Sequence, residues 1–297
     1  GLCRDGKILN KSVVPTKSHQ GPEAVINSMA EAAFEVMKGV SREDCLGIGV
    51  GAAGQIDART GTVLYAPNLL WTDVHLAALL GAKLGLPVKV VNDVRAATIA
   101  EWKFGAGKEL HNFVNIFLGT GIGSGLVMNG ILVEGASNSA GEIGHTCLDP
   151  NGPVCGCGKK GCFEAFSSGR GVENQVKARL NSGCQSLIRE LVHGDISKVS
   201  GPLIGQAARQ GDSLALEILE NAGTWLGFAL ANLHTFLNPE IILLGGGFMA
   251  LSEFFLPAAE RSLKRHVLPV ADRPNLIGLA SFSTDAGIIG SSAAVTL

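Results

Sequence analysis

GEIGHTCLDPNGPVCGCGKKGCFEAF, residues 141–166, gathers one histidine, two glutamates and four of the seven cysteines of the chain. Within it, the pattern H-x9-C-x-C-x4-C is formed by His145, Cys155, Cys157 and Cys162. Three thiolates and one imidazole make the closed tetrahedral shell of a structural zinc site. The C-x-C spacing is tighter than that of most zinc sites, and the flanking glycines let the backbone wrap this closely. The sequence therefore predicts structural zinc at these four residues, and the alternative is a loop of free thiols.

Three further side chains of this stretch have less specific predictions. Cys147 is a possible thiol ligand, but it is less favoured because the other four residues already close the shell. Glu142 and Glu164 lie on either side of the predicted zinc ligands. A loop held by zinc would keep these carboxylates rigid, and carboxylates accept hydrogen bonds from sugar hydroxyls. The alternative for each glutamate is an ordinary solvated or capping side chain.

The composition is that of a folded protein of about two domains. The chain has 297 residues, 46% of them hydrophobic, and a formal net charge of −2. No block of basic residues indicates nucleic acid or an anionic membrane as a partner, and no apolar run reaches the length of about 20 residues that spans a bilayer. We find no secretory signal peptide, and the cysteine spacing is not that of a disulfide framework. We therefore expect a protein of the reducing cytoplasm.

Strands and helices alternate along both halves of the chain, which indicates an α/β fold. A hairpin is expected at 1–16, with its turn at Asp5-Gly6. Apolar spacing and capping residues predict helices within 22–39, 75–85, 94–107 and 213–237, and a last helix from about Asp285 to the end. Buried strands are predicted within 45–54, 87–93 and 240–247, and glycine-joined strands within 113–135. A domain boundary is expected near 107–112.

The stretch VVND, residues 90–93, places Asn92 and Asp93 where a buried strand ends and a helix begins. Ligands of α/β proteins bind at the carboxyl ends of strands. The helix dipole also favours an ionised carboxylate at this position, and such a group can accept a proton from a substrate hydroxyl. The alternative is an ordinary N-cap.

Two glycine-rich loops follow predicted strands. LGTGIGSG, residues 118–125, has the backbone freedom to form an anion-binding nest, and Thr120 adds a hydroxyl. It lacks the G-K-[ST] ending of a P-loop, and a plain hairpin turn is the alternative. LLGGGF, residues 243–248, could let a nucleotide approach the backbone closely, or could simply turn the chain from strand to helix.

The sequence supports weaker predictions for several other residues. Gly54, Gln55 and Asn68 are expected near a possible cleft. Trp71 is better explained by core or rim packing than by stacking on a sugar. The remaining histidines have no companions at ligand or triad spacing, and no G-x-S-x-G elbow supports a serine hydrolase.

Taken together, these motifs resemble those of the ROK (repressor, open reading frame, kinase) family of sugar kinases. The resemblance covers nearly the whole chain. It rests on VVND at 90–93, AEWKFGAGK at 100–108, GTGIGSG at 119–125, GEIGH at 141–145, CGCGKKGCFEA at 155–165 and NPEIILLGGG at 238–247. It implies an actin-like (ribonuclease H-like) α/β fold of two domains with an interdomain cleft. The small domain would comprise 1–111 and a C-terminal helix at about 285–297, and the large domain would comprise 112–284 with the zinc loop.

The resemblance also implies roles for individual residues in ATP-dependent phosphorylation of a hexose. Asp93 would be the general base. The sugar would be bound by Asn92, Glu142, His145 and Glu164, with Gly54 and Asn68 nearby. ATP would lie against Gly119, Thr120, Gly121, Gly123, Gly245, Gly246 and Gly247, and Mg²⁺ would bridge its phosphates. His145 would bind zinc through one ring nitrogen and face a sugar hydroxyl with the other.

Several alternatives remain open within this resemblance. Glucose, phosphorylated at its 6-hydroxyl, is the first expectation for the substrate, and N-acetylmannosamine or N-acetylglucosamine is the second. A third possibility is a transcriptional regulator of the family that senses sugar without phosphorylating it. We expect no nucleic acid or membrane as partner, and we expect a homodimer or homotetramer. The family opens with a strand carrying D-x-G-G-T, and the sequence begins after the point where that strand would stand, so we expect the small domain to lack its first strand.

Overall fold

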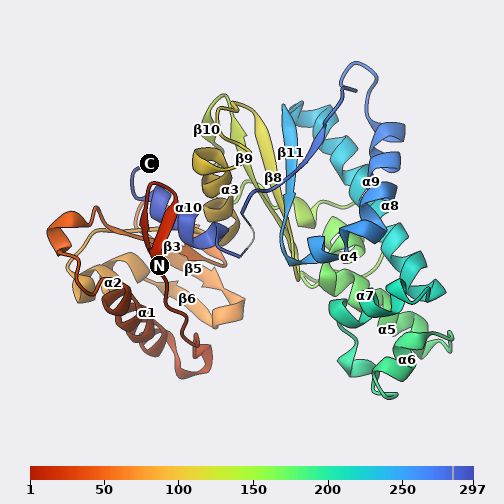
Figure 1. Cartoon of the computed structure of the whole chain (residues 1–297), viewed down its shortest axis with the longest axis horizontal. Helices are drawn as coiled ribbons and strands as arrows, with labels where there is room; N and C mark the ends of the chain where they lie inside the picture. The colour runs from red at the N-terminus through yellow and green to blue at the C-terminus, as the bar shows by residue number, and fades with distance from the viewer. Residues whose placement is uncertain (283) are drawn as a thin grey trace. The chain divides into compact units, whose positions relative to one another are not determined.

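The computed structural model describes residues 1–282 and 284–297, and the chain divides into two compact units. Unit 1 comprises Gly1–Asn115, Gly125–Gly141 and Ala280–Leu297, and unit 2 comprises Ile116–Ser124 and Glu142–Leu279. Both chain ends therefore lie in unit 1 (Figure 1). This division differs from the predicted domains chiefly at 125–141, which belongs to unit 1.

Unit 1 begins with the predicted hairpin. Strands β1 (Leu2–Arg4) and β2 (Lys7–Asn10) pair antiparallel. The turn between them has φ of 49° at Asp5 and 75° at Gly6. Two consecutive residues with positive φ make the turn type whose twist matches a two-residue hairpin, so the Asp-Gly prediction is confirmed.

Two further small sheets lie in unit 1, which also holds part of the five-stranded sheet described below. The parallel pair β3 (Ile48–Ala52) and β7 (Val88–Asn92) is aligned so that Ala52 faces Asn92. A three-stranded antiparallel sheet comprises β4 (Gln55–Asp57), β5 (Thr62–Ala66) and β6 (Trp71–Val74). The sequence predicted β3 and β7 but not this second sheet.

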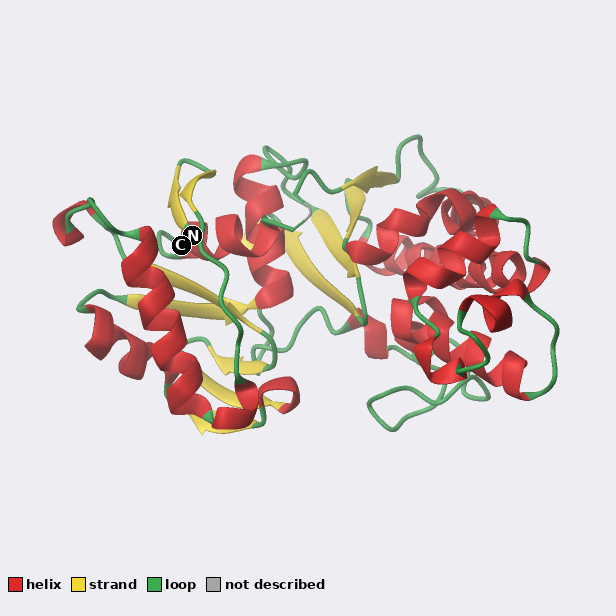
Figure 2. Ribbon diagram, turned by 60° about the horizontal axis from the view of Figure 1, so that its bottom comes forward, coloured by secondary structure: helices red, strands yellow, loops and turns green. Residues whose placement is uncertain are grey.

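Helices flank these sheets (Figure 2). They are α1 (Pro22–Val36), α2 (Leu76–Leu84), α3 (Asp93–Phe104) and α10 (Ala286–Ala294). Pro22 lies in the first turn of α1, where its missing N–H costs nothing. Trp71 is only 2% exposed and belongs to the hydrophobic core, so its predicted packing role is confirmed.

The β1–β2 hairpin and the β3–β7 pair form separate sheets among the described residues. Residues of β1 and of β3 nevertheless line the same cavity, whose volume is about 730 Å³. Apolar residues of α1 and α10 complete its lining.

The largest sheet has five strands in the order β10-β9-β8-β11-β12. Its strands are β8 (Phe113–Leu118), β9 (Ile122–Met128), β10 (Ile131–Leu132), β11 (Ile241–Gly245) and β12 (Ile277–Leu279). The predicted strands in 113–135 and 240–247 are thereby confirmed.

The helices of unit 2 are α4 (Phe163–Ser167), α5 (Gly169–Asn181), α6 (Leu187–Leu191), α7 (Gly201–Arg209), α8 (Ser213–Leu237) and α9 (Ser252–His266). The long helix α8 has the predicted bounds, and its C-cap is Asn238, which has a φ of 44°. Helices α8 and α9 run side by side (Figure 1). They approach closely because glycine stands at the contact: a Cβ at Gly223 would lie 2.0 Å from the carbonyl oxygen of Phe255.

Among the described helices, none combines the length and apolar character needed to cross a bilayer.

Candidate functional site

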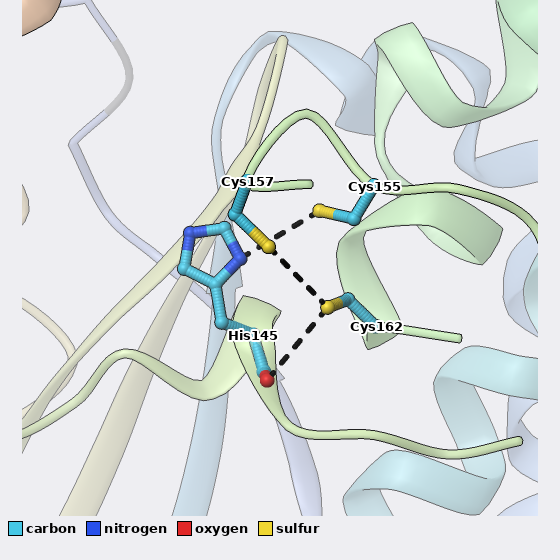
Figure 3. A group of neighbouring side chains, drawn as sticks. All are labelled: His145, Cys155, Cys157 and Cys162. Atoms are coloured by element: carbon cyan, nitrogen blue, oxygen red, sulfur yellow. Dashed lines mark hydrogen bonds between the residues drawn. The ribbon is translucent and has the colours of Figure 1, made fainter. Parts of the chain in front are cut away.

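The four predicted zinc ligands converge at one point of unit 2 (Figure 3). All their ligand atoms lie within 4.8 Å of one another. The Sγ atoms of Cys157 and Cys162 are 3.7 Å apart, and Sγ of Cys155 is 3.7 Å from Nδ1 of His145. A tetrahedral zinc ion with bonds of about 2.3 Å to sulfur requires ligand–ligand distances of about 3.8 Å. The four side chains therefore fit a closed zinc shell.

The protonation state of the thiols would change on binding of a cation. Burial raises the pKa of the Cys155 thiol to about 12 and also raises the pKa of Cys162. The backbone N–H of Lys159 lowers the pKa of Cys157. Without a metal, the two buried thiols therefore stay protonated at neutral pH. A zinc ion supplies the positive charge that stabilises the thiolates, so zinc binding would release protons.

The backbone around the cluster folds tightly because glycine occupies a position that no other residue can take. Gly161 has a φ of 70°, and a Cβ there would lie 1.6 Å from the carbonyl oxygen of Asp149. The N–H of Leu148 donates to the carbonyl of Gly161 at 2.8 Å, which closes the loop. Cys147 lies outside the cluster, and its Sγ is 3.7 Å from the carbonyl oxygen of Lys160.

Glu164, in α4, connects the zinc cluster to the first glycine loop. Its Oε2 accepts a hydrogen bond from the N–H of Ile122 at 2.9 Å, and its Oε1 lies 3.6 Å from Sγ of Cys155. A Cβ at Gly121 would lie 2.4 Å from Oε2, so only glycine permits this approach. The carboxylate is half-buried and fixed in place, as a binding group requires.

Glu142 precedes the short 3-10 turn Ile143–His145 and His145 ends it, and both side chains are exposed. A Cβ at Gly144 would lie 2.2 Å from the carbonyl oxygen of Ile122, so the turn packs directly against the start of β9. His145 presents Nδ1 to the sulfur atoms, and its other ring nitrogen points away from them (Figure 3). The contact of that nitrogen with a sugar hydroxyl stays a prediction.

The two predicted nucleotide loops lie at the same end of neighbouring strands. Gly246, after β11, has a φ of 99°, and a Cβ there would lie 2.3 Å from the carbonyl oxygen of Leu118 at the end of β8. Gly245 ends β11, and Gly247 has open space where a side chain would stand. An open backbone at the carboxyl ends of strands is a typical nucleotide-binding arrangement.

The first of these loops is also tied to the start of α5. The N–H groups of Gly169 and Arg170 donate to the carbonyls of Gly119 and Thr120, at 2.9 and 3.1 Å. The N–H of Gly119 donates to Gly121 within the loop, so it does not point outward as an anion-binding nest would require. Gly123 lies within β9 rather than in the loop, because the strand begins at Ile122.

In unit 1, strand register places the carboxyl ends of β3 and β7, and with them the predicted residues Gly54 and Asn92, at one edge. Pairing of Ala52 with Asn92 places the loop that follows β3 beside Asn92 and Asp93. A Cβ at Gly54, in that loop, would lie 2.4 Å from the carbonyl oxygen of Tyr65. Two residues beyond Tyr65 begins the turn Pro67–Leu69, which contains the exposed Asn68.

Asn92 and Asp93 have different roles at the start of α3. Asn92 is the N-cap: its Oδ1 accepts hydrogen bonds from the N–H groups of Val94 and Arg95 at 3.0 and 3.2 Å. Its amide nitrogen can donate to another group. Asp93 is exposed, and its Oδ1 accepts a hydrogen bond from the N–H of Val94 at 2.9 Å. Asn92 therefore has the N-cap role that the sequence offered as the alternative to a catalytic one. The Asp93 carboxylate faces solvent at the helix N-terminus, where the helix dipole favours its negative charge.

Two polar residues of this edge were not singled out by the sequence. Arg95 is buried, and its guanidinium donates to the side chain and the carbonyl of Asn138. These residues are 43 positions apart and follow no motif, so only the folded structure reveals the pair.

Comparison with known proteins agrees with these observations. The chain is 34% identical over 295 residues to a glucokinase of Streptomyces coelicolor, covering 97% of this chain and 90% of that protein. It is 30% identical over 291 residues to an N-acetylmannosamine kinase of Escherichia coli O157:H7, with the same two coverages. A crystal structure of a ROK family glucokinase from Streptomyces griseus, in complex with glucose and AMPPNP, superposes with a TM-score of 0.83 at 32% identity, covering 98% of this chain and 93% of that one. The family model of the ROK family matches residues 2–296, and the chain belongs to this family.

Proposed function

We propose that this protein is an ATP-dependent hexose kinase, and that it transfers the γ-phosphoryl group to the 6-hydroxyl of glucose. The observation that carries the proposal is the exposed Asp93 carboxylate at the N-terminus of α3, on the edge of unit 1 that also holds Gly54, Asn68 and Asn92. Kinship with glucokinases over nearly the whole chain supports the choice of reaction.

Asp93 acts as general base on the attacking hydroxyl. Phosphoryl transfer depends mostly on positioning and charge stabilisation, so the base needs to align the hydroxyl more than to ionise it fully. Asn92 fits a supporting role, because its amide nitrogen can donate to a sugar oxygen while its amide oxygen caps the helix. Gly54 and Asn68 border the same edge.

Unit 2 contributes hydrogen-bonding side chains for the sugar and the loops for the nucleotide. The sugar hydroxyls are bound by three side chains, Glu142, His145 and Glu164. Glu142 and His145 are exposed, and Glu164 is held rigidly beside the zinc cluster. The loops at Gly119–Gly121 and Gly245–Gly247 receive the nucleotide. Mg²⁺ accompanies ATP and neutralises phosphate charge in reactions of this class. Zinc, with its shell closed by four protein ligands, has a structural role.

A coupled assay that detects ADP, run with a panel of hexoses and N-acetylhexosamines, tests this function. We expect the highest kcat/KM with glucose and no turnover without a divalent cation. The kinship to an N-acetylmannosamine kinase makes that sugar the second candidate, and a higher kcat/KM for it would replace glucose in the proposal. Absence of sugar-dependent ADP formation with every sugar would contradict the proposed reaction. Light scattering would test the predicted homodimer or homotetramer.

A further inference from the structure

A buried arginine fastens one loop of unit 1 to helix α3. Arg95 is only 4% exposed. Its Nη2 donates to the carbonyl oxygens of Asn138 at 2.8 Å and of Glu134 and Ala140 at 3.3 Å each, while Nη1 donates to Oδ1 of Asn138. A buried guanidinium is costly unless its N–H groups are paired, so three carbonyls gathered on one side chain fix the backbone of 134–140. We call these residues, Glu134–Ala140, the clamped loop.

Asn138 gives the clamped loop a second attachment, to β4. Its Nδ2 donates to the carbonyl oxygen of Ile56 at 2.6 Å. Its backbone has a φ of 56°, which asparagine tolerates better than most residues. The Asn138 side chain therefore connects Arg95, in the first turn of α3, with Ile56 of β4, the strand that begins after Gly54.

Both attachments lie next to residues with proposed sugar roles. Arg95 follows Asp93 by two positions on α3, and Ile56 follows Gly54 by two positions. The clamped loop therefore borders the edge that holds the general base. It carries Ser137 and Ser139, whose hydroxyl oxygens are 2.7 Å apart, and hydroxyl groups can both donate to and accept from a sugar.

We propose that the clamped loop forms a further wall of the hexose site, that its serine hydroxyls contribute to the choice of sugar, and that Arg95 and Asn138 are positioning residues for it. This inference rests on the proposed kinase function. It assigns the loop to sugar recognition and not to ATP binding, because both of its attachments lie beside sugar-binding positions of unit 1. A purely structural clamp would instead affect stability and leave sugar affinity unchanged.

Asn138→Gly provides a clean test, because glycine accepts a positive φ while both side-chain hydrogen bonds disappear. We expect KM for the sugar to rise by about three- to thirtyfold, with KM for ATP unchanged, because a loosened wall loses hydrogen bonds to the sugar. Asn129→Gly is the matched control: Asn129 is exposed in the β9–β10 turn and has a φ of 52°. KM for the sugar and KM for ATP of Asn129→Gly should equal those of the wild type.

A second variant separates positioning from stability. Asn138→Asp keeps an acceptor for Arg95, but it replaces the donor to Ile56 with a carboxylate oxygen that the Ile56 carbonyl repels. It should therefore recover only part of the sugar affinity that Asn138→Gly loses. The ratio of kcat/KM between glucose and N-acetylmannosamine should also change in Asn138→Gly. Sugar binding measured by calorimetry without ATP should weaken in parallel with KM.

The outcomes distinguish this inference from the proposed function. A wild-type protein that phosphorylates no sugar would overturn the function itself. An active wild type whose Asn138→Gly variant retains its sugar KM, its calorimetric affinity and its sugar preference would overturn the role of the clamped loop alone. A fall in melting temperature with unchanged sugar affinity would assign Arg95 and Asn138 to stability only.

Discussion

The Asp93 carboxylate is exposed and bound only by the N–H of its neighbour Val94 among the hydrogen bonds described for it. Asp93→Asn keeps the shape of the side chain and removes the proton acceptor. We expect kcat to fall by about 10²–10⁴-fold, the usual contribution of a general base. Sugar affinity measured by calorimetry should stay within a few fold of the wild type. A variant with unchanged kcat would remove Asp93 from the chemistry.

His234 makes stability depend on pH. Its ring is fully buried in α8, and this burial lowers its pKa below the ordinary value, while the carbonyl of Leu276 partly opposes the shift and the charge of Arg273 adds to it. The folded state therefore binds this proton less readily than the unfolded state does, so the free energy of unfolding should decrease as pH falls below about 6.5.

Urea unfolding at pH 7.5 and pH 5.5 measures this decrease. The variant His234→Phe, which cannot titrate, isolates the contribution of the ring. We expect the wild type to lose more stability than the variant between the two pH values. Equal losses would show that other groups cause the dependence.

For single residues, the sequence predicted a site whose members lie close together in the chain, but it did not predict contacts between residues far apart in the chain. The zinc ligands span residues 145–162, so their pattern is visible in the sequence, and the structure brings all four together. The roles of Asn92 and Asp93 depend on which of the two residues caps α3, and the sequence was compatible with either. Arg95 and Asn138 could not be predicted, because an arginine in an amphipathic helix normally faces solvent.

Among helices and strands, those with a long periodic pattern of apolar residues were predicted, and the short strands without one were not. Helices α1 and α8 combine long apolar stripes with clear end signals, and both were predicted. The sheet β4-β5-β6 was missed, because β4 has only three residues and Pro67 interrupts the chain between β5 and β6. Alternation over so few residues cannot be distinguished from a loop.

The zinc loop offers a prediction at the scale of structural elements. Cys157→Ser removes one of three thiolates, so we expect loss of bound zinc and a rise in KM for the sugar, because His145 and Glu164 lose the cluster that orients them. Zinc content by atomic absorption and sugar KM by the coupled assay are the measurements. Cys147→Ser is the control, since Cys147 lies in the same loop outside the cluster. A variant without zinc that keeps a normal sugar KM would separate the metal from the sugar site.

For the whole molecule, the predicted fold class is confirmed by structural kinship to a ROK family glucokinase. The extent of unit 1 depends on contacts that no motif indicates. Asn115 donates to the hydroxyl of Thr98, and a Cβ at Gly125 would lie 2.2 Å from the same hydroxyl oxygen. Together with the clamped loop, these contacts assign 125–141 to unit 1, whereas composition alone suggested a single boundary near 107–112.

The chain re-enters unit 1 at its end, where the N–H of Phe282 donates to Oε1 of the buried Glu101 at 2.7 Å. Helix α10 then packs on α3 so closely that a Cβ at Gly290 would lie 1.6 Å from the carbonyl oxygen of Ala96. Gly290→Ala must push the two helices apart, and backbone cannot yield as a flexible side chain can. We expect a loss of about 1–3 kcal/mol or more in the free energy of unfolding.

Gly287→Ala is the matched control in the same helix, because a Cβ at Gly287 meets no atom within 4 Å. There, alanine should leave stability unchanged or raise it by up to about 1 kcal/mol, since alanine favours helix more than glycine does. Urea unfolding of the wild type and both variants gives the comparison. If Gly290→Ala and Gly287→Ala unfold at the same urea concentration, the close packing of α10 on α3 does not hold the end of the chain in unit 1. If only Gly290→Ala is destabilised, the C-terminal helix is an integral part of the unit in which the chain begins.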